Sequence, residues 1–137
     1  MRQFAISVIN QTGNASISSA VIDARQLYRI SGQVIVGAGA STAGTVQLQY
    51  SCDPMASSGV SGGGVTITGA GVVTGVTNWT SLGTAVTVSG AAAAVPILFA
   101  TNTFADIGYA WIRAVYTDSS GGTGAGKVTV NLNFQGF

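Results

Sequence analysis

Charge is the scarcest property of this sequence. Lys and Arg together number 5, the acidic residues number 4, and His is absent from the 137 residues. All of the acidic residues are Asp, so Glu is absent as well. Enzymes move protons most often with His or a carboxylate, and Ser-His-Asp and Cys-His arrangements both need a His. The composition therefore argues against an enzyme, and we assign no catalytic residue.

Cysteine is equally scarce, because Cys52 stands alone. It can form no disulfide within the chain, and a single Cys without His cannot supply the usual ligands of zinc. We expect Cys52 to be a small core side chain. Calcium needs only oxygen ligands, but Asp53, Asp106 and Asp118 are isolated from one another in the sequence, so we interpret them as solvated turn residues. No metal ion and no other cofactor is predicted.

Basic clusters and long apolar runs are missing too. The formal net charge is +1 and the cations are scattered, which disfavours nucleic-acid binding, because affinity for phosphate comes mainly from clustered Lys and Arg. No stretch reaches the ~20 apolar residues of a membrane helix. Residues 1–6 lead directly into alternating strand sequence, without the pattern of a secretory signal. We expect synthesis in a cytoplasm and no association with membranes.

Apolar and small residues, by contrast, are plentiful. Hydrophobic residues make up 47% of the sequence, which is enough for a core, and the length fits a single domain over residues 1–137. Only 7% of the residues are charged, against about 25% in an average soluble domain. A surface this neutral suits a protein that neighbouring subunits cover. We therefore interpret the chain as a subunit of an assembly.

Apolar and polar residues alternate along most of the chain, which is typical of half-buried β-strands. The clearest segment is the last, where four apolar residues of 128–134 alternate with Thr129, Asn131, Asn133 and Gln135, so that one face is apolar and the other amide-rich. Further strands are predicted over Phe4–Ile9, Ser16–Ile22, Tyr28–Val36, Val46–Cys52, Val65–Thr68, Val72–Val76, Ala85–Ser89 and Trp111–Tyr116.

The connections between these strands indicate how they pair. We expect the strands at 28–36 and 46–52 to form a hairpin across the Gly-rich residues 37–44, and residues 91–96 to be a connection. Many short strands without a helical crossover indicate an all-β fold, namely an antiparallel β-sandwich that resembles a jelly roll.

Two segments are candidate contact elements. Residues 53–64 are rich in Gly and Ser and predict an exposed loop that becomes ordered against a partner. The other is the apolar C-terminus. Our candidate partner contacts are Asp53, Pro54, Met55, Phe134 and Phe137.

The aromatic residues favour packing over ligand binding. Trp111 lies within an alternating strand and Trp79 shortly before Leu82, so we interpret both as core or inter-sheet side chains. If the protein binds glycans instead, Trp79 is the candidate platform for stacking a sugar ring. Arg113 is expected to be a structural cation that pairs with an Asp or stacks on a ring.

The order of segments between residues 46 and 116 resembles a known group of proteins. The segments are Gln47–Ser51, Cys52–Pro54, Asn78–Gly83, Val86–Gly90 and Ile107–Thr117. In this order they resemble small β-sandwich proteins that bacteriophage genomes encode among their virion structural genes, and also discoidin-like modules. The Gly-rich insertion between Asp53 and Trp79 is longer than in that group, and Ala110 stands where a more polar residue is usual.

The resemblance implies a virion structural protein. Such a protein is made in the host cytoplasm and enters the virion as a decoration, capsomer-associated or fibre-base subunit, with other virion proteins and copies of itself as partners. Two alternatives remain: a carbohydrate-binding or host-adhesion module that stacks a sugar on Trp79, and a jelly-roll protein that forms the capsid shell itself.

Overall fold

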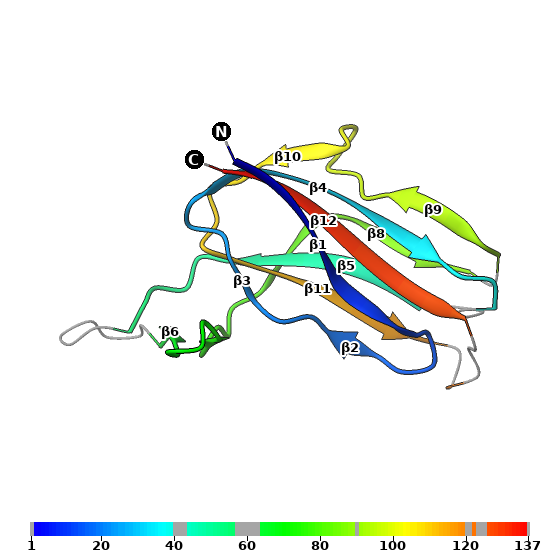
Figure 1. The fold of residues 1–137 in the computed structure, drawn as a ribbon, viewed down its shortest axis with the longest axis horizontal. Helices are drawn as coiled ribbons and strands as arrows, with labels where there is room; N and C mark the ends of the chain where they lie inside the picture. Colours follow the sequence, from blue (N-terminus) through cyan, green and yellow to red (C-terminus); the bar gives the residue numbers. More distant parts are fainter. Residues whose placement is uncertain are drawn as a thin grey trace.

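The chain folds into two antiparallel β-sheets that pack face to face (Figure 1). This computed structural model describes residues 2–39, 44–56, 64–89, 91–119, 122 and 126–136. Every regular element within them is a strand, and the predicted all-β antiparallel sandwich is confirmed. The architecture follows from the alternating sequence, because each long strand carries one apolar row and two facing sheets can bury those rows against each other.

The first sheet, which we call sheet A, has the order β1-β12-β4, and β9 and β10 both pair with the remaining edge of β4. Its strands are β1 (Arg2–Thr12), β4 (Leu27–Val36), β9 (Ala93–Pro96), β10 (Phe104–Asp106) and β12 (Lys127–Gly136). In sheet B the order is β11-β5-β8, and β2 and β3 both pair with β11. Its strands are β2 (Ile17–Ser18), β3 (Ile22–Asp23), β5 (Gly44–Ser51), β8 (Thr80–Val88) and β11 (Trp111–Asp118). A separate ribbon pairs β6 (Thr66–Ile67) with β7 (Val73–Thr74).

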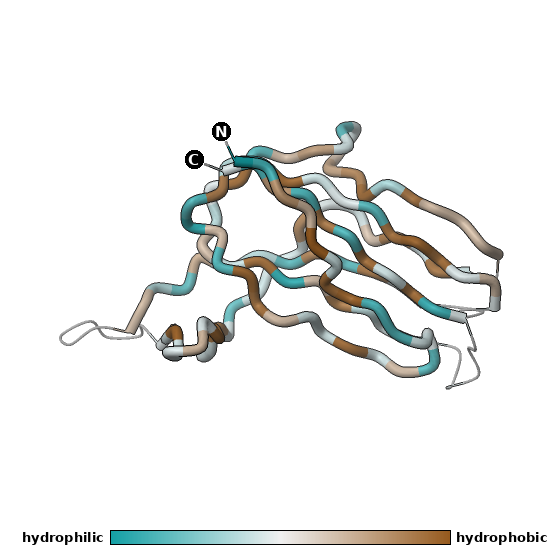
Figure 2. Tube along the Cα trace, viewed as in Figure 1, coloured by the Kyte–Doolittle hydropathy of each residue, from teal (hydrophilic) through white to brown (hydrophobic). Residues whose placement is uncertain are grey.

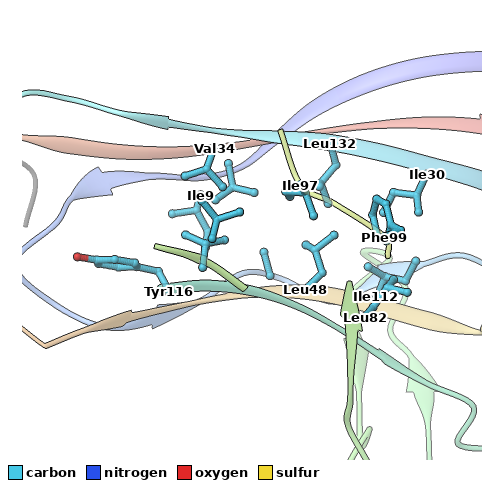
Figure 3. Packing of buried hydrophobic residues seen from close by; sticks show 14 of the residues in the cluster. Ile9, Ile30, Val34, Leu48, Leu82, Ile97, Phe99, Ile112, Tyr116 and Leu132 are labelled. Carbon is cyan, nitrogen blue, oxygen red and sulfur yellow. The ribbon is translucent and has the colours of Figure 1, made fainter. Parts of the chain in front are cut away.

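Strand β12 lies at the centre of sheet A and its apolar row faces the core. Val128, Val130, Leu132 and Phe134 are all 0% exposed, as the alternation of the sequence predicts. The inner rows of β4, β5 and β11 face the same space, so that apolar side chains from both layers meet between the sheets (Figure 3). Figure 2 shows hydrophobic and hydrophilic residues alternating along the long strands. The amide row of β12 is thereby turned outward, on the far side of sheet A.

A glycine in β4 makes room for this packing. Gly32 pairs with Leu132, and a Cβ at Gly32 would lie 2.7 Å from Leu132 Cδ2 and 3.0 Å from Ile97 Cδ1. The absence of a side chain therefore lets the two larger side chains meet above it. Ile97 N also donates to the Gly32 carbonyl, while Thr84 N in β8 donates to the carbonyl of Leu98, so residues 97–98 join the two sheets at this margin.

The structure corrects two expectations about pairing. Strands β4 and β5 do not form a hairpin, because they lie in different sheets and each already has partners on both of its edges. The chain crosses from sheet A to sheet B between residues 37 and 44. Residues 93–96 are not a connection but strand β9, with Pro96 at its end on an edge strand, where a missing N–H is tolerated. The weak pair predicted at 65–68 and 72–76 is present as β6 and β7.

Candidate binding surfaces

Between β5 and β8 the chain leaves sheet B and returns to it; we call residues 52–79 the 52–79 segment. Its described part carries the β6–β7 ribbon, which projects beyond the sandwich in Figure 1. A second apolar cluster forms beneath it, separate from the main core. The cluster contains Val65, Val73 and Trp111, with Val21, Ile67, Val76, Trp79 and Ala110 packed around them. Trp111 points to the outer face of sheet B and is 0% exposed, because the segment packs over it and the Arg25 guanidinium lies 5.2 Å from the centre of its ring.

The Asp53 carboxylate holds the two ends of this segment together. Its Oδ2 accepts hydrogen bonds from the backbone N–H groups of Thr77 (2.8 Å) and Asn78 (3.0 Å), and its Oδ1 accepts from Asn78 Nδ2 (2.8 Å). These bonds stabilise the ionised form and lower the pKa of Asp53 to about 2, with the backbone N–H of Asn78 contributing most. The carboxylate of Asp53, a predicted contact residue, is therefore engaged in hydrogen bonds within the chain; we call this arrangement the Asp53 clamp.

The other predicted contact residues have different fates. Pro54 and Met55 are exposed at the start of the 52–79 segment and remain available to a partner. Phe134 is not available, because β12 keeps its alternation and places this ring in the core, 0% exposed and stacked on Phe4 at 5.4 Å. That prediction is wrong. Phe137 lies outside the described residues, as does 57–63 of the predicted loop.

Trp79 is a half-buried side chain that a cation already covers. The Arg113 guanidinium lies 4.2 Å from the centre of the Trp79 ring, and Arg113 Nε donates to Gln49 Oε1 at 2.8 Å. Arg113 therefore stacks on a ring, as one of the two predicted arrangements has it, and burial lowers its pKa. Because Arg113 lies over the Trp79 ring, and the ring also packs against the second apolar cluster, this half-buried side chain is a poor platform for a sugar.

The remaining Asp side chains are also engaged within the chain. Asp23 pairs with Arg25 at 2.7 Å and Asp106 pairs with Arg29 at 3.1 Å, while Asp118 accepts from the backbone N–H of Gly122. Within the part of the chain that the structure describes, no three His, Cys, Asp or Glu residues lie close enough to hold a metal ion. These two ion pairs involve four of the nine charged side chains of the protein.

Cys52 lies in the 52–79 segment just beyond the end of β5 and is exposed, so the expectation of a core thiol is wrong. Its neighbour Ser51, the last residue of β5, is buried instead and its Oγ accepts a hydrogen bond from the backbone N–H of Asp53. The strand ends one residue earlier than predicted, and its alternation does not extend to Cys52.

Two surface features remain free. The first is the outer edge of β1, which among the described residues pairs only with β12. The second is the outer face of sheet A, where side chains of β1, β12, β4, β9 and β10 form three cross-strand rows. The rows are Gln3, Gln135, Arg29 and Asp106; then Ala5, Asn133, Ser31 and Phe104; then Ser7, Asn131, Gln33 and Pro96. We call this surface the amide face.

Two adjoining depressions lie on the amide face. One, of about 350 Å³, extends from Ala5 across β12 and β4 to Pro96, and the other, of about 230 Å³, lies between Arg29, Phe104 and Gln135. They share Ser31, Thr103 and Asn133 in their linings. A larger hollow of about 520 Å³ opens at the end of the sandwich, where the paired Asp23 and Arg25 form part of its wall.

Comparisons with known proteins identify no family for this chain. No protein-family model, no curated protein and no solved structure matches the chain. In the described ranges, no helix has the length and apolar character needed to cross a membrane. The function is therefore argued from the surfaces themselves.

Proposed function

We propose that this chain is a structural subunit of an assembly, specifically a capsid-associated component of a bacteriophage virion, and that it acts through contacts with copies of itself. The observation that carries the assembly is the free edge of β1. The virion setting rests on the sequence resemblance described above.

Strand β1 is a long edge with few features that prevent pairing. It spans 11 residues, and Arg2 at its start is its one charged residue. Natural sheets usually protect such edges with Lys, Pro, inward charges or a covering segment, because unpaired N–H and C=O groups bind other strands. β1 contains no Lys or Pro, and the feature that interrupts its edge is a bulge between Ser7 and Ile9. The other long edge, β8, is tied at Thr84 to Leu98.

A second copy of β1 is the occupant that we propose for this edge. Two β1 strands that pair antiparallel about a twofold axis satisfy each other's backbone groups and continue sheet A from one subunit into the next. In that arrangement each Arg2 lies toward the Thr12 end of the other strand, so the two charges stay apart. The remaining surface opposes association weakly, because charged residues are few and the net charge is only +1.

Light scattering of the purified chain tests both parts of the proposal. We expect the wild type to be a dimer or larger at micromolar concentration. Ser7→Lys places a Lys on the free edge, where two copies bring like charges together, and we expect the dissociation constant to rise by about tenfold or more. The matched control is Asn131→Lys, since Asn131 pairs with Ser7 on the same face but one strand away from the edge.

The outcomes separate the assembly from its interface. A wild type that stays monomeric at high concentration contradicts the assembly itself. If the Ser7→Lys variant assembles as well as the wild type, the assembly is supported but the β1 interface is contradicted. Closed shells in electron micrographs of the purified chain would favour the alternative of a capsid shell protein, and mass spectrometry of purified phage particles tests the virion setting directly.

A further inference from the structure

The amide face has more hydrogen-bonding groups than the protein uses. Its amide side chains are Gln3, Gln33, Asn131, Asn133 and Gln135. Among the described residues, one hydrogen bond joins two of these amides. It runs from Gln3 Nε2 to Asn133 Oδ1 and is long, at 3.5 Å. Each amide offers an acceptor oxygen and two donor hydrogens, so the surface presents many unsatisfied groups of both kinds.

The shape of the face concentrates these groups in a groove. The short side chains of Ala5 and Ser31 flank Asn133 in the middle row, which leaves the floor low and produces the two depressions. Phe104 ends that row and remains 42% exposed, so an aromatic ring stands at one margin of the groove.

The electrostatics of the groove favour a neutral ligand. Its charged residues are Arg29 and Asp106, which pair with each other at 3.1 Å. The Arg29 guanidinium also lies 4.6 Å from the centre of the Phe104 ring and helps to fix it. An anion would have to displace Asp106, and a cation would find one paired carboxylate, so neither is suited to this surface.

We infer that the groove on the amide face binds a neutral saccharide. Sugar hydroxyls donate and accept hydrogen bonds, as the amides do, and the C–H face of a sugar ring packs on an exposed aromatic side chain such as Phe104. A groove with a few convergent polar groups beside an apolar ring is a usual form of small-ligand site. The inference goes beyond the proposed assembly role and does not depend on it. It also moves the glycan alternative from Trp79 to the opposite sheet.

Binding of the full chain to an array of neutral and charged oligosaccharides tests the inference, followed by calorimetry with the best neutral glycan on the array. We expect binding to neutral glycans, with the affinity reduced by about tenfold or more in Asn133→Ala and in Phe104→Ala. Both side chains lie on the outer face, so the variants should fold, which circular dichroism checks. The matched control is Thr87→Ala, an exposed position on the outer face of sheet B.

Four results would overturn the inference. The first is a wild type that binds no neutral glycan on the array, and the second is preferential binding of sulfated or sialylated glycans. The third is binding that survives Asn133→Ala and Phe104→Ala but is lost in Trp79→Ala, which would place the site on sheet B. The fourth is coverage of the amide face by copies of the chain. It is tested with an Asn133→Cys thiol in a Cys52→Ser background. If this thiol reacts with a thiol reagent only after the assembly dissociates, the occupant of the face is a protein and not a saccharide.

Discussion

Trp111 Nε1 donates a hydrogen bond to the backbone carbonyl oxygen of Asp53 at 2.8 Å, across 58 residues of sequence. The bond joins the outer face of sheet B to the point where the 52–79 segment begins. Trp111 is 0% exposed although it points away from the main core, because the segment and Arg25 both pack against it. The indole is thus the anchor of the second apolar cluster, and its hydrogen bond fixes the position of the segment.

Replacing this indole should release the segment while leaving the sandwich folded. Trp111→Ala removes the centre of the second cluster, and we expect the free energy of unfolding to fall by about 3–5 kcal/mol. Trp111→Phe retains most of the apolar contact but leaves the Asp53 carbonyl without its donor, which should cost about 1–3 kcal/mol. Urea denaturation measures both values, and limited proteolysis should cut residues 54–76 first in Trp111→Ala. Equal losses in the two variants would contradict the role of the ring.

The Asp53 clamp makes stability depend on pH in acid. In the folded protein the pKa of Asp53 lies at about 2, whereas the ordinary value is 3.8. Between these values the unfolded chain binds more protons than the folded one, so stability falls as the pH drops from about 4 to about 2. We expect Asp53→Asn to be less stable than wild type at pH 6 and to lose less stability than wild type on acidification. Urea denaturation at a series of pH values checks this.

The control for that experiment is Asp106→Asn. The Asp106 carboxylate pairs with Arg29 at the surface, where its side chain is 77% exposed. Such pairs contribute little to stability. The variant should therefore keep the acid dependence of the wild type, and an equal flattening in both variants would show that the effect does not arise from the clamp.

Local pattern predicted the long strands but missed the short strands β9 and β10, and it did not predict how the strands pair. The alternation at 128–134 predicted the buried row of β12 correctly, because a period of two fixes which side chains share a face. It does not fix which sheet supplies the opposite face. Strands β4 and β5 both bury one row in the same core, and a hairpin or a crossing between layers satisfies their patterns equally well.

The candidate sites show the same division. The sequence identified the amide row of β12, but its neighbours on the amide face come from β1, β4, β9 and β10, whose registers depend on tertiary packing. Asp53 was identified as a turn residue, yet its partners Thr77 and Asn78 lie 24 and 25 residues away. No local signal connects residues at that separation.

Cys52 offers a simple chemical check on the end of β5. Because the thiol is exposed, it should react with a water-soluble disulfide reagent in the native protein, with one equivalent consumed before any denaturant is added. A core thiol would react only on unfolding. Cys52→Ser should abolish the reaction and change the free energy of unfolding by no more than about 0.5 kcal/mol. A native protein that resists the reagent would mean that this end of β5 is covered.

Two glycines with the same backbone conformation allow strain to be separated from crowding. Gly71 has φ +81° and Gly83 has φ +77°, a region that costs a residue with a side chain about 1–2 kcal/mol. A Cβ at Gly71 would meet nothing within 4 Å, whereas one at Gly83 would lie 2.8 Å from the Leu98 carbonyl oxygen and 3.0 Å from Phe99 Cδ1.

We therefore expect Gly71→Ala to lower the free energy of unfolding by about 1–2 kcal/mol, the cost of the conformation alone. Gly83→Ala should cost about 1–3 kcal/mol more, because the methyl group forces β8 away from residues 98–99, where the two sheets are joined. Urea denaturation of both variants measures the difference. Equal losses would mean that β8 and residues 98–99 can separate freely, and the margin of the sandwich at β8 would then be a second open edge.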